Sequence, residues 1–267
     1  MALIKCDFFS DVLGLSTSMY AILPQNTQNQ IGMTGNTLQK EPPVLYLLHG
    51  LSDDCSTWIR RTSIERYVAE KGIAVIMPQV DRSFYTDMVH GNKYWTFISD
   101  ELPKISRSFF RLSSERDDNF IAGLSMGGYG AFKMALSCTD KFKAAASLSG
   151  CLDICSSYRK NQNDSNVIAI EFENIFGDYN YLPGSGNDLF YLMDKIISEN
   201  KEKPMLYQCC GLEDFLYEEN TNFKEYANKL GYDLTYSEEH ATHDWAYWDK
   251  KIQDVLDWLP IHKIHSN

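Results

Sequence analysis

The 267-residue sequence lacks any apolar run of membrane-spanning length, and it has no basic stretch longer than pairs such as Arg60-Arg61 and Lys250-Lys251. Acidic residues outnumber basic residues, 36 to 25, which gives a formal net charge of -11. A chain without clustered cations is poorly suited to bind phosphate backbones or anionic lipids. These absences argue against nucleic-acid binding and against attachment to or passage through a membrane.

Paired CxxC motifs, internal repeats and low-complexity linkers are also absent. The seven cysteines are an odd number, and Cys138, Cys209 and Cys210 lie in apolar segments, where free thiols behave as small hydrophobic side chains. We therefore expect no metal site and only structural thiols. Charge appears by Lys5, too early for the apolar core of a secretory signal, so we expect a cytoplasmic protein.

What the sequence contains is a regular alternation of strand-length apolar segments and helix-length segments. This alternation predicts a doubly wound α/β fold in one domain, residues 1–267, with a mostly parallel sheet and helices on both faces. Strands are expected at 3–10, 16–23, 44–48, 73–77, 119–124, 144–148, 204–210 and 233–238, the first two as an antiparallel edge. Helices are expected at 57–71, 96–110, 128–138, 221–230 and 245–259, and Pro103 should kink or restart the second.

The most informative motif is Gly123-Leu124-Ser125-Met126-Gly127, between a predicted strand and a helix of small residues. This is the G-x-S-x-G nucleophile elbow in the context that it requires. We expect the glycines to permit unusual φ values in a sharp turn that leaves the Ser125 hydroxyl exposed. The helix that follows directs its free N–H groups at any negative charge that develops on a substrate carbonyl.

A serine nucleophile needs a base and an acid that orients the base, and in hydrolases of this architecture they follow in the order Ser, Asp or Glu, His. Asp214 comes just after the buried strand 204–210, where open parallel sheets form their sites. We predict Asp214 as the acid, with the adjacent Glu213 as its competitor. Of the later histidines, His240 and His243 both lie in the connection from a strand to the last helix, and either could reach the site.

The predicted oxyanion hole combines two backbone N–H groups. One belongs to Met126, directly after the nucleophile, and the other to Leu51, in the loop His49-Gly50-Leu51 that follows an early central strand. His49 precedes the acid in the chain, so we expect it to brace this loop rather than to catalyse. Trp58 lies soon after the same loop and is a candidate substrate-binding residue, although a core position explains it equally well.

These motifs resemble the esterase D group of α/β-hydrolases, especially its bacterial tributyrin esterases and feruloyl esterase-like enzymes. The matching segments are spread over nearly the whole chain: Leu47-Leu48-His49-Gly50-Leu51-Ser52-Asp53, Gly123-Leu124-Ser125-Met126-Gly127-Gly128, Cys210-Gly211-Leu212-Glu213-Asp214-Phe215-Leu216-Tyr217, and His243-Asp244-Trp245 with Trp248. The resemblance implies an α/β-hydrolase fold with Ser125, Asp214 and His243 as the catalytic triad, and with Leu51 and Met126 as oxyanion donors. His240 would then be a surface residue.

The resemblance implies a carboxylesterase that uses no cofactor and acts on a small-molecule ester with a short acyl or aryl-acyl group. S-formylglutathione hydrolysis is an alternative, because thioesters pass through a similar oxyanion. A non-catalytic binding module on a hydrolase scaffold is a third. Residues 151–203 mix aromatic residues with Asn, Asp and Gly, which predicts an irregular insertion that caps the catalytic edge. The sequence leaves a homo-oligomer open.

Overall fold

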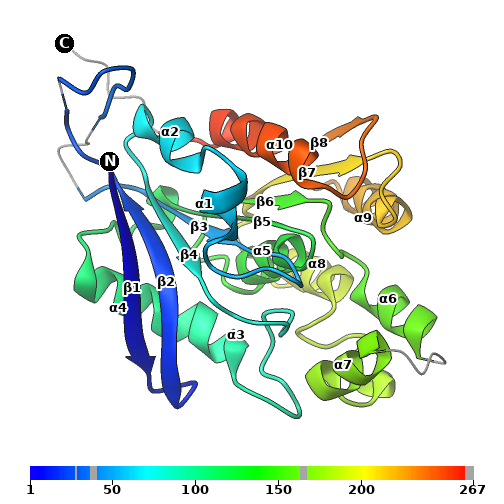
Figure 1. Ribbon diagram of the computed structural model, residues 1–267. Helices are drawn as coiled ribbons and strands as arrows, with labels where there is room; N and C mark the ends of the chain where they lie inside the picture. Colours follow the sequence, from blue (N-terminus) through cyan, green and yellow to red (C-terminus); the bar gives the residue numbers. More distant parts are fainter. Residues whose placement is uncertain (28, 37–40, 163–166, 262–267) are drawn as a thin grey trace.

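The computed structural model describes residues 1–27, 29–36, 41–162 and 167–261. Within these ranges an eight-stranded sheet runs through the molecule in the order β1-β2-β4-β3-β5-β6-β7-β8 (Figure 1). The β1–β2 and β2–β4 pairs are antiparallel and the other pairs are parallel. The strands are β1 (Ala2–Ser10), β2 (Leu15–Leu23), β3 (Val44–Leu48), β4 (Ala74–Pro78), β5 (Asn119–Leu124), β6 (Ala144–Leu148), β7 (Met205–Gly211) and β8 (Leu234–Glu239).

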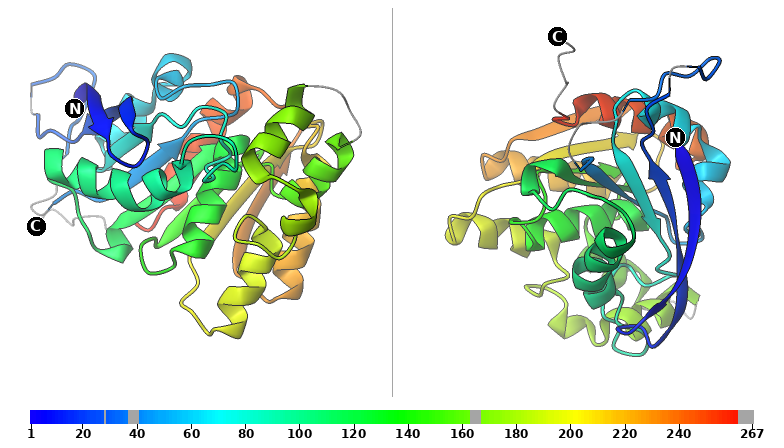
Figure 2. Two further views of the ribbon diagram at one scale, coloured as in Figure 1. Left: turned by 90° about the horizontal axis from the view of Figure 1, so that it is seen from below. Right: turned by 90° about the vertical axis from the view of Figure 1, so that its left-hand side faces the viewer.

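Helices cover both faces of the sheet (Figures 1 and 2). One face carries α1 (Thr57–Arg61), α2 (Ile64–Ala69) and α10 (Trp245–Trp258). The opposite face carries α3 (Tyr94–Thr96), α4 (Leu102–Phe109), α5 (Met126–Ser137), α6 (Ile154–Asn161), α7 (Val167–Phe176), α8 (Leu189–Ser198) and α9 (Tyr217–Lys229). This arrangement confirms the predicted α/β-hydrolase layout, including the antiparallel edge.

Strand geometry explains the two-sided core. Successive side chains of a strand point to opposite faces, so Val44, Tyr46 and Leu48 join one hydrophobic cluster while Leu45 and Leu47 join the other. All five are buried, as expected for a parallel strand covered on both sides. Helix α5 lies in the first cluster and is buried from Met126 to Leu136, which places it in the middle of the molecule.

Apart from shifts at their ends, three predicted elements differ from the observed ones. The expected helix 57–71 is two short helices separated at Thr62 and Ser63. The expected helix 96–110 contains a π-helical turn, Phe97–Glu101, before α4 begins at Leu102, so the predicted restart near Pro103 is confirmed. The segment 151–203, expected to be irregular, contains α6, α7, a short 3-10 turn (Tyr179–Tyr181) and α8.

The described residues hold no helix with the combined length and apolar character that a membrane crossing needs. All seven cysteines are described and are free thiols.

Candidate active site

Ser125 occupies a strained turn between β5 and α5. Its φ of 53° and ψ of -119° are backbone angles that residues other than glycine rarely adopt. Such backbone strain is concentrated at functional sites. The flanking glycines do not have positive φ values, so the expected reason for them is wrong. A Cβ on Gly123 would lie 2.3 Å from the Gly127 carbonyl oxygen, and one on Gly127 would lie 2.6 Å from that of Leu48. The two glycines are needed for close backbone approach.

The turn is fixed to the neighbouring strand. The Ser125 N–H donates to the Leu148 carbonyl at the end of β6 (2.9 Å), and the Ser125 carbonyl accepts from Cys151 (3.3 Å). Helix α5 begins at Met126, directly beside the serine, so the positive end of its dipole faces the Ser125 side chain. The elbow is therefore held at the carboxyl ends of the parallel strands.

The loop after β3 packs against this elbow. A Cβ on Gly50 would lie 3.7 Å from Ser125 Cβ and 2.7 Å from a methyl of Leu124, so only glycine allows this approach. Within the described ranges, neither the Leu51 N–H nor the Met126 N–H donates to a protein acceptor. Two unsatisfied donors beside a strained serine are what an oxyanion hole requires.

His49 braces this loop, as predicted. Its Nε2 accepts from the Val80 N–H (3.2 Å), which leaves Nδ1 as the donor to the Gly50 carbonyl (2.8 Å). The ring is 1% exposed, and this burial lowers the pKa of His49, so the neutral form is favoured. The Tyr85 hydroxyl donates to the His49 carbonyl (2.9 Å), a second brace that sequence reasoning missed.

Asp214 and His243 form a hydrogen-bonded pair of titratable side chains at this edge. Asp214 follows β7 and His243 follows β8, and the parallel register of these strands brings the two loops together. His243 Nδ1 lies 2.8 Å from Oδ2 and 3.0 Å from Oδ1 of Asp214. The carboxylate is inaccessible to solvent, and Oδ1 also accepts from the Leu216 N–H (2.9 Å). The Asp214 carboxylate is thus fixed, and it orients the His243 imidazole.

Aromatic side chains hold the imidazole on two sides. The Phe215 ring centre lies 4.5 Å from that of His243, and the Trp248 ring meets the imidazole edge-on at 4.8 Å. Trp248 is anchored in turn, because its indole N–H donates to the Ser149 hydroxyl (3.2 Å) at the end of β6. Phe215 is 75% exposed, so its outer face is open to a ligand. Its place directly after Asp214 is the only sequence signal for it.

Glu213 and His240 form a separate, exposed pair beside the first. Glu213 accepts from His240 Nδ1 (2.7 Å) and from the Ala241 N–H (2.9 Å), so it ties the acid loop to the histidine loop. This hydrogen bond raises the pKa of His240 and lowers the pKa of Glu213. Glu213, the alternative to Asp214 as the acid, is therefore hydrogen-bonded to His240, the alternative to His243 as the base.

Two expected contacts are not seen directly among the described residues: the bond between Ser125 and His243, and a contact of Trp58 with substrate. Within the described ranges the Ser125 hydroxyl makes no hydrogen bond to His243, although the loops that carry them converge through Ser149 and Trp248. Trp58 is 1% exposed, donates to the Leu48 carbonyl (2.9 Å) and packs on Trp245, so it supports the site from the core. A substrate contact for Trp58 stays a prediction.

No group of three or more His, Cys, Asp or Glu side chains in the described part of the chain is arranged to hold a metal ion.

Comparisons with known proteins agree with this geometry. Over 262 residues, 97% of this chain and 98% of the relative, the sequence is 31% identical to an acetyl esterase of Caldicellulosiruptor saccharolyticus. Two Staphylococcus aureus structures are each 38% identical: FphF, a fluorophosphonate-binding serine hydrolase with bound substrate, and FrmB, described as an S-formylglutathione hydrolase. The FphF structure has a TM-score of 0.85, and the match covers 98% of this chain and 99% of FphF. The FrmB structure has a TM-score of 0.82, and the match covers 97% of this chain and 98% of FrmB.

A family model described as "Putative esterase" matches residues 14–259. The predicted resemblance to esterases of the α/β-hydrolase fold is thereby confirmed, as is the prediction of an ester-hydrolysing enzyme. The chain belongs to this esterase family.

Proposed function

We propose that the protein is a serine carboxylesterase that cleaves short-chain acyl esters with Ser125 as nucleophile, His243 as base and Asp214 as the orienting acid. The observation that carries this proposal is the 2.8 Å contact between His243 Nδ1 and the buried Asp214 carboxylate, at the edge where Ser125 stands in its strained turn. An Nδ1–H bound to the carboxylate leaves Nε2 free to accept the serine proton.

In this mechanism Ser125 Oγ attacks the ester carbonyl as Nε2 of His243 takes the hydroxyl proton. The carbonyl oxygen becomes an oxyanion, which accepts hydrogen bonds from the Leu51 and Met126 N–H groups. His243 then donates its proton to the departing alkoxide, and the acyl group stays on Ser125. Water, activated by the same base, attacks this acyl-enzyme and releases the acid. The missing Ser125–His243 hydrogen bond is expected to form with substrate, because such bonds are often loose in ligand-free structures.

The likeness to an acetyl esterase over 97% of the chain supports a short acyl group. We also propose that residues 151–203 shape the substrate pocket as a cap. Support comes from Cys151, which opens this segment and is hydrogen-bonded to the Ser125 carbonyl. A cytoplasmic location stays a prediction.

A second candidate activity is the hydrolysis of S-formylglutathione. The likeness to FrmB, at 38% identity, favours it. A thioester would use the same nucleophile and the same oxyanion donors, so the site geometry does not separate the two reactions. The difference lies in the leaving group, a bulky thiol tripeptide in one case and a small alcohol in the other.

The test compares kcat/KM for p-nitrophenyl acetate, p-nitrophenyl butyrate, methyl ferulate and S-formylglutathione. We expect the short-chain esters to be the best substrates and Ser125→Ala to lower kcat by at least about 10³-fold. A fluorophosphonate probe should label Ser125 in the folded protein, as read by mass spectrometry. A much higher kcat/KM for S-formylglutathione would favour the second candidate. Failure to label Ser125, with most activity kept in Ser125→Ala, would overturn the triad.

A further inference from the structure

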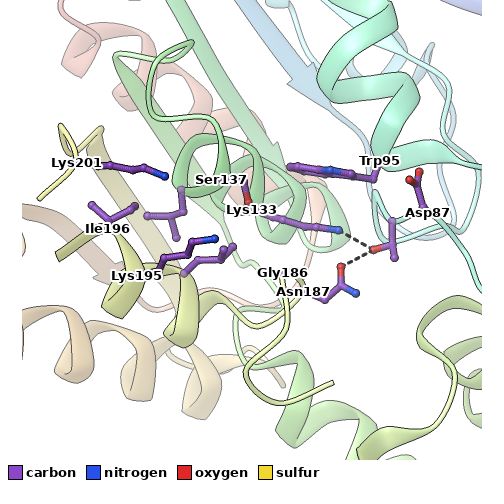
Figure 3. Close-up of a pocket in the computed structure, with 12 residues that line it drawn as sticks. Asp87, Trp95, Lys133, Ser137, Gly186, Asn187, Lys195, Ile196 and Lys201 are labelled. Atoms are coloured by element: carbon purple, nitrogen blue, oxygen red, sulfur yellow. Dashed lines mark hydrogen bonds between the residues drawn. The ribbon is translucent and has the colours of Figure 1, made fainter. Parts of the chain in front are cut away.

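A cavity lies away from the Ser125 elbow, between α5, α8 and the loop after β4 (Figure 3). Its volume is about 320 Å³, near the lower end of the range for small-molecule sites. Lys133 of α5 lines it, seven residues after Met126, which is about 10 Å along the helix from the proposed oxyanion hole. The cavity is therefore a separate site that the proposed esterase reaction does not use.

The cavity contains a buried ammonium group without a carboxylate partner. Lys133 is 2% exposed, and its Nζ donates to the Tyr85 carbonyl and to the Thr86 hydroxyl, both at 2.9 Å. In the described part of the chain, no carboxylate oxygen lies within 4.0 Å of this Nζ. Buried charges in proteins are normally paired, so this one lacks its usual complement.

Two more lysines line the same cavity, across from this group. Lys195 from α8 and Lys201, just after it, line the opposite side of the cavity, and Figure 3 shows both side chains directed toward the α5 side. The one carboxylate in the lining, Asp87, is already occupied, because it accepts from the N–H and the hydroxyl of Thr96. Lys201 is paired with the Glu199 carboxylate (2.6 Å), whereas Lys133 and Lys195 have no ion pair in the described part of the chain, so these two give the cavity a local positive potential.

The rest of the lining would suit an apolar body with a polar end. Leu136, Leu192 and Ile196 supply buried aliphatic surface, and the Trp95 ring lies 4.6 Å from the Lys133 ammonium. The Asn187 side chain lies beside Thr86 at the same end as the ammonium (Figure 3). The cavity thus combines charged and polar groups with an apolar wall.

We propose that this cavity binds a small organic anion, namely a carboxylate attached to a short aliphatic or aromatic body. The carboxylate would accept from the Lys133 ammonium, and Lys195 would add positive charge from across the cavity. The body would pack on Leu136, Leu192 and Ile196. Charge-assisted hydrogen bonds are stronger than those between neutral groups, so the carboxylate should contribute much of the affinity of such a ligand.

The titration of Lys133 gives a specific signature. Burial lowers the pKa of Lys133 to about 7. Asp87 from the loop is the charged group that acts on it, and the Tyr129 phenol lies on its own helix. Lys195 and Lys201 lie across the cavity, and Lys201 is paired with Glu199. Because an anion binds the protonated ammonium, affinity should be higher at pH 6 than at pH 8.5.

The experiment titrates benzoate, and its uncharged analogue benzamide, into the protein by calorimetry. The same titration is made with Ser125→Ala and with wild-type protein blocked by phenylmethylsulfonyl fluoride. Any benzoate that binds at the catalytic edge rather than in the cavity is thereby identified. The test variant is the double substitution Lys195→Gln/Lys201→Gln. Both lysine side chains are exposed, so the variant should fold like the wild type. Lys229→Gln, an exposed lysine of α9 outside the cavity, is the matched control.

We expect benzoate to bind at least about tenfold more tightly than benzamide, and the double variant to weaken benzoate by a similar factor. Lys229→Gln and the blocked enzyme should bind benzoate like the wild type, and affinity should fall from pH 6 to pH 8.5. Equal binding of benzoate and benzamide, equal affinity of the double variant and Lys229→Gln, or loss of benzoate binding in the blocked enzyme would each overturn the proposal. So would unchanged affinity in a folded Lys133→Met variant, checked by circular dichroism.

Discussion

The two histidines beyond β8 differ in what they touch. His243 is paired with a buried carboxylate and enclosed by Phe215 and Trp248, whereas the His240 side chain is 87% exposed and paired with Glu213. A general base must be held in one orientation and one tautomer, and only His243 is held in this way. The environment of each ring therefore supports His243, rather than His240, as the proposed base.

We predict that His243→Ala lowers kcat for p-nitrophenyl acetate by at least about 10³-fold, because the proposed base is lost. His240→Ala should change kcat by less than about tenfold, because it removes only an exposed pair beside the site. Steady-state kinetics at pH 7.5 would check both variants, with circular dichroism as the folding control. The opposite ranking would assign the base to His240.

Which residues could be identified from sequence depends on how local their signal is. Ser125, Gly50 and Asp214 follow strands whose order can be read from the pattern, so their convergence is predictable. Tyr85 and Trp248 act through contacts with residues far away in the chain, and no local pattern specifies such contacts. The strain at Ser125 itself, rather than at its glycines, also depends on packing that only the folded chain shows.

At the scale of elements, α5 is packed unusually closely on its neighbours. Its position Gly130 faces the Tyr85 ring, where an added Cβ would lie 2.4 Å from a ring carbon. Tyr85 cannot move away easily, because its hydroxyl is bound to the His49 carbonyl and its carbonyl to Lys133. The helix and the oxyanion loop are thus joined through one tyrosine.

We predict that Gly130→Ala destabilises the protein by about 1–3 kcal/mol, although alanine is the better helix former by about 1 kcal/mol. The clash with Tyr85 outweighs the gain in propensity. Urea unfolding would measure the change. Ser137→Ala, at the half-buried end of the same helix, is the control and should be neutral or slightly stabilising. Greater stability in Gly130→Ala would show that the Tyr85 ring adapts.

The bounds of the central strands could be predicted almost to the residue, because buried parallel strands are short apolar runs with clear ends. Helix bounds were less predictable. Nothing in the pattern of 57–71 marks the break at Thr62, where the hydroxyl bonds back to the Trp58 carbonyl. Helix α9 begins at Tyr217, earlier than expected, because Tyr217 bonds to the Asp214 carbonyl just after the acid loop.

At the scale of the whole molecule, the seven cysteines are free thiols, four of them buried and three partly buried. Burial raises the pKa of each, to about 11 for Cys55 and about 12 for Cys155 and Cys209. Because the thiolate is the reactive form, folding should protect these side chains in two ways, by covering them and by keeping them protonated.

We predict that Ellman's reagent at pH 8 labels the native protein far more slowly than the urea-unfolded chain, in which all seven thiols should react. Cys6, half-buried on the edge strand β1, should react first, so Cys6→Ser should remove the fastest phase. Absorbance at 412 nm follows the reaction. Rapid labelling of several thiols in the native state would mean that the interior opens readily.

The position of β8 has a consequence for how catalytic competence arises during synthesis. The elbow at Ser125 and the strands around it leave the ribosome well before β8, which ends the sheet and leads into the His243 loop. With the proposed triad, a nascent chain can therefore display Ser125 in a largely assembled sheet and still be inert. The onset of ester cleavage in a translating or refolding sample would mark the arrival of the final strand, and the enzyme would report the completion of its own folding.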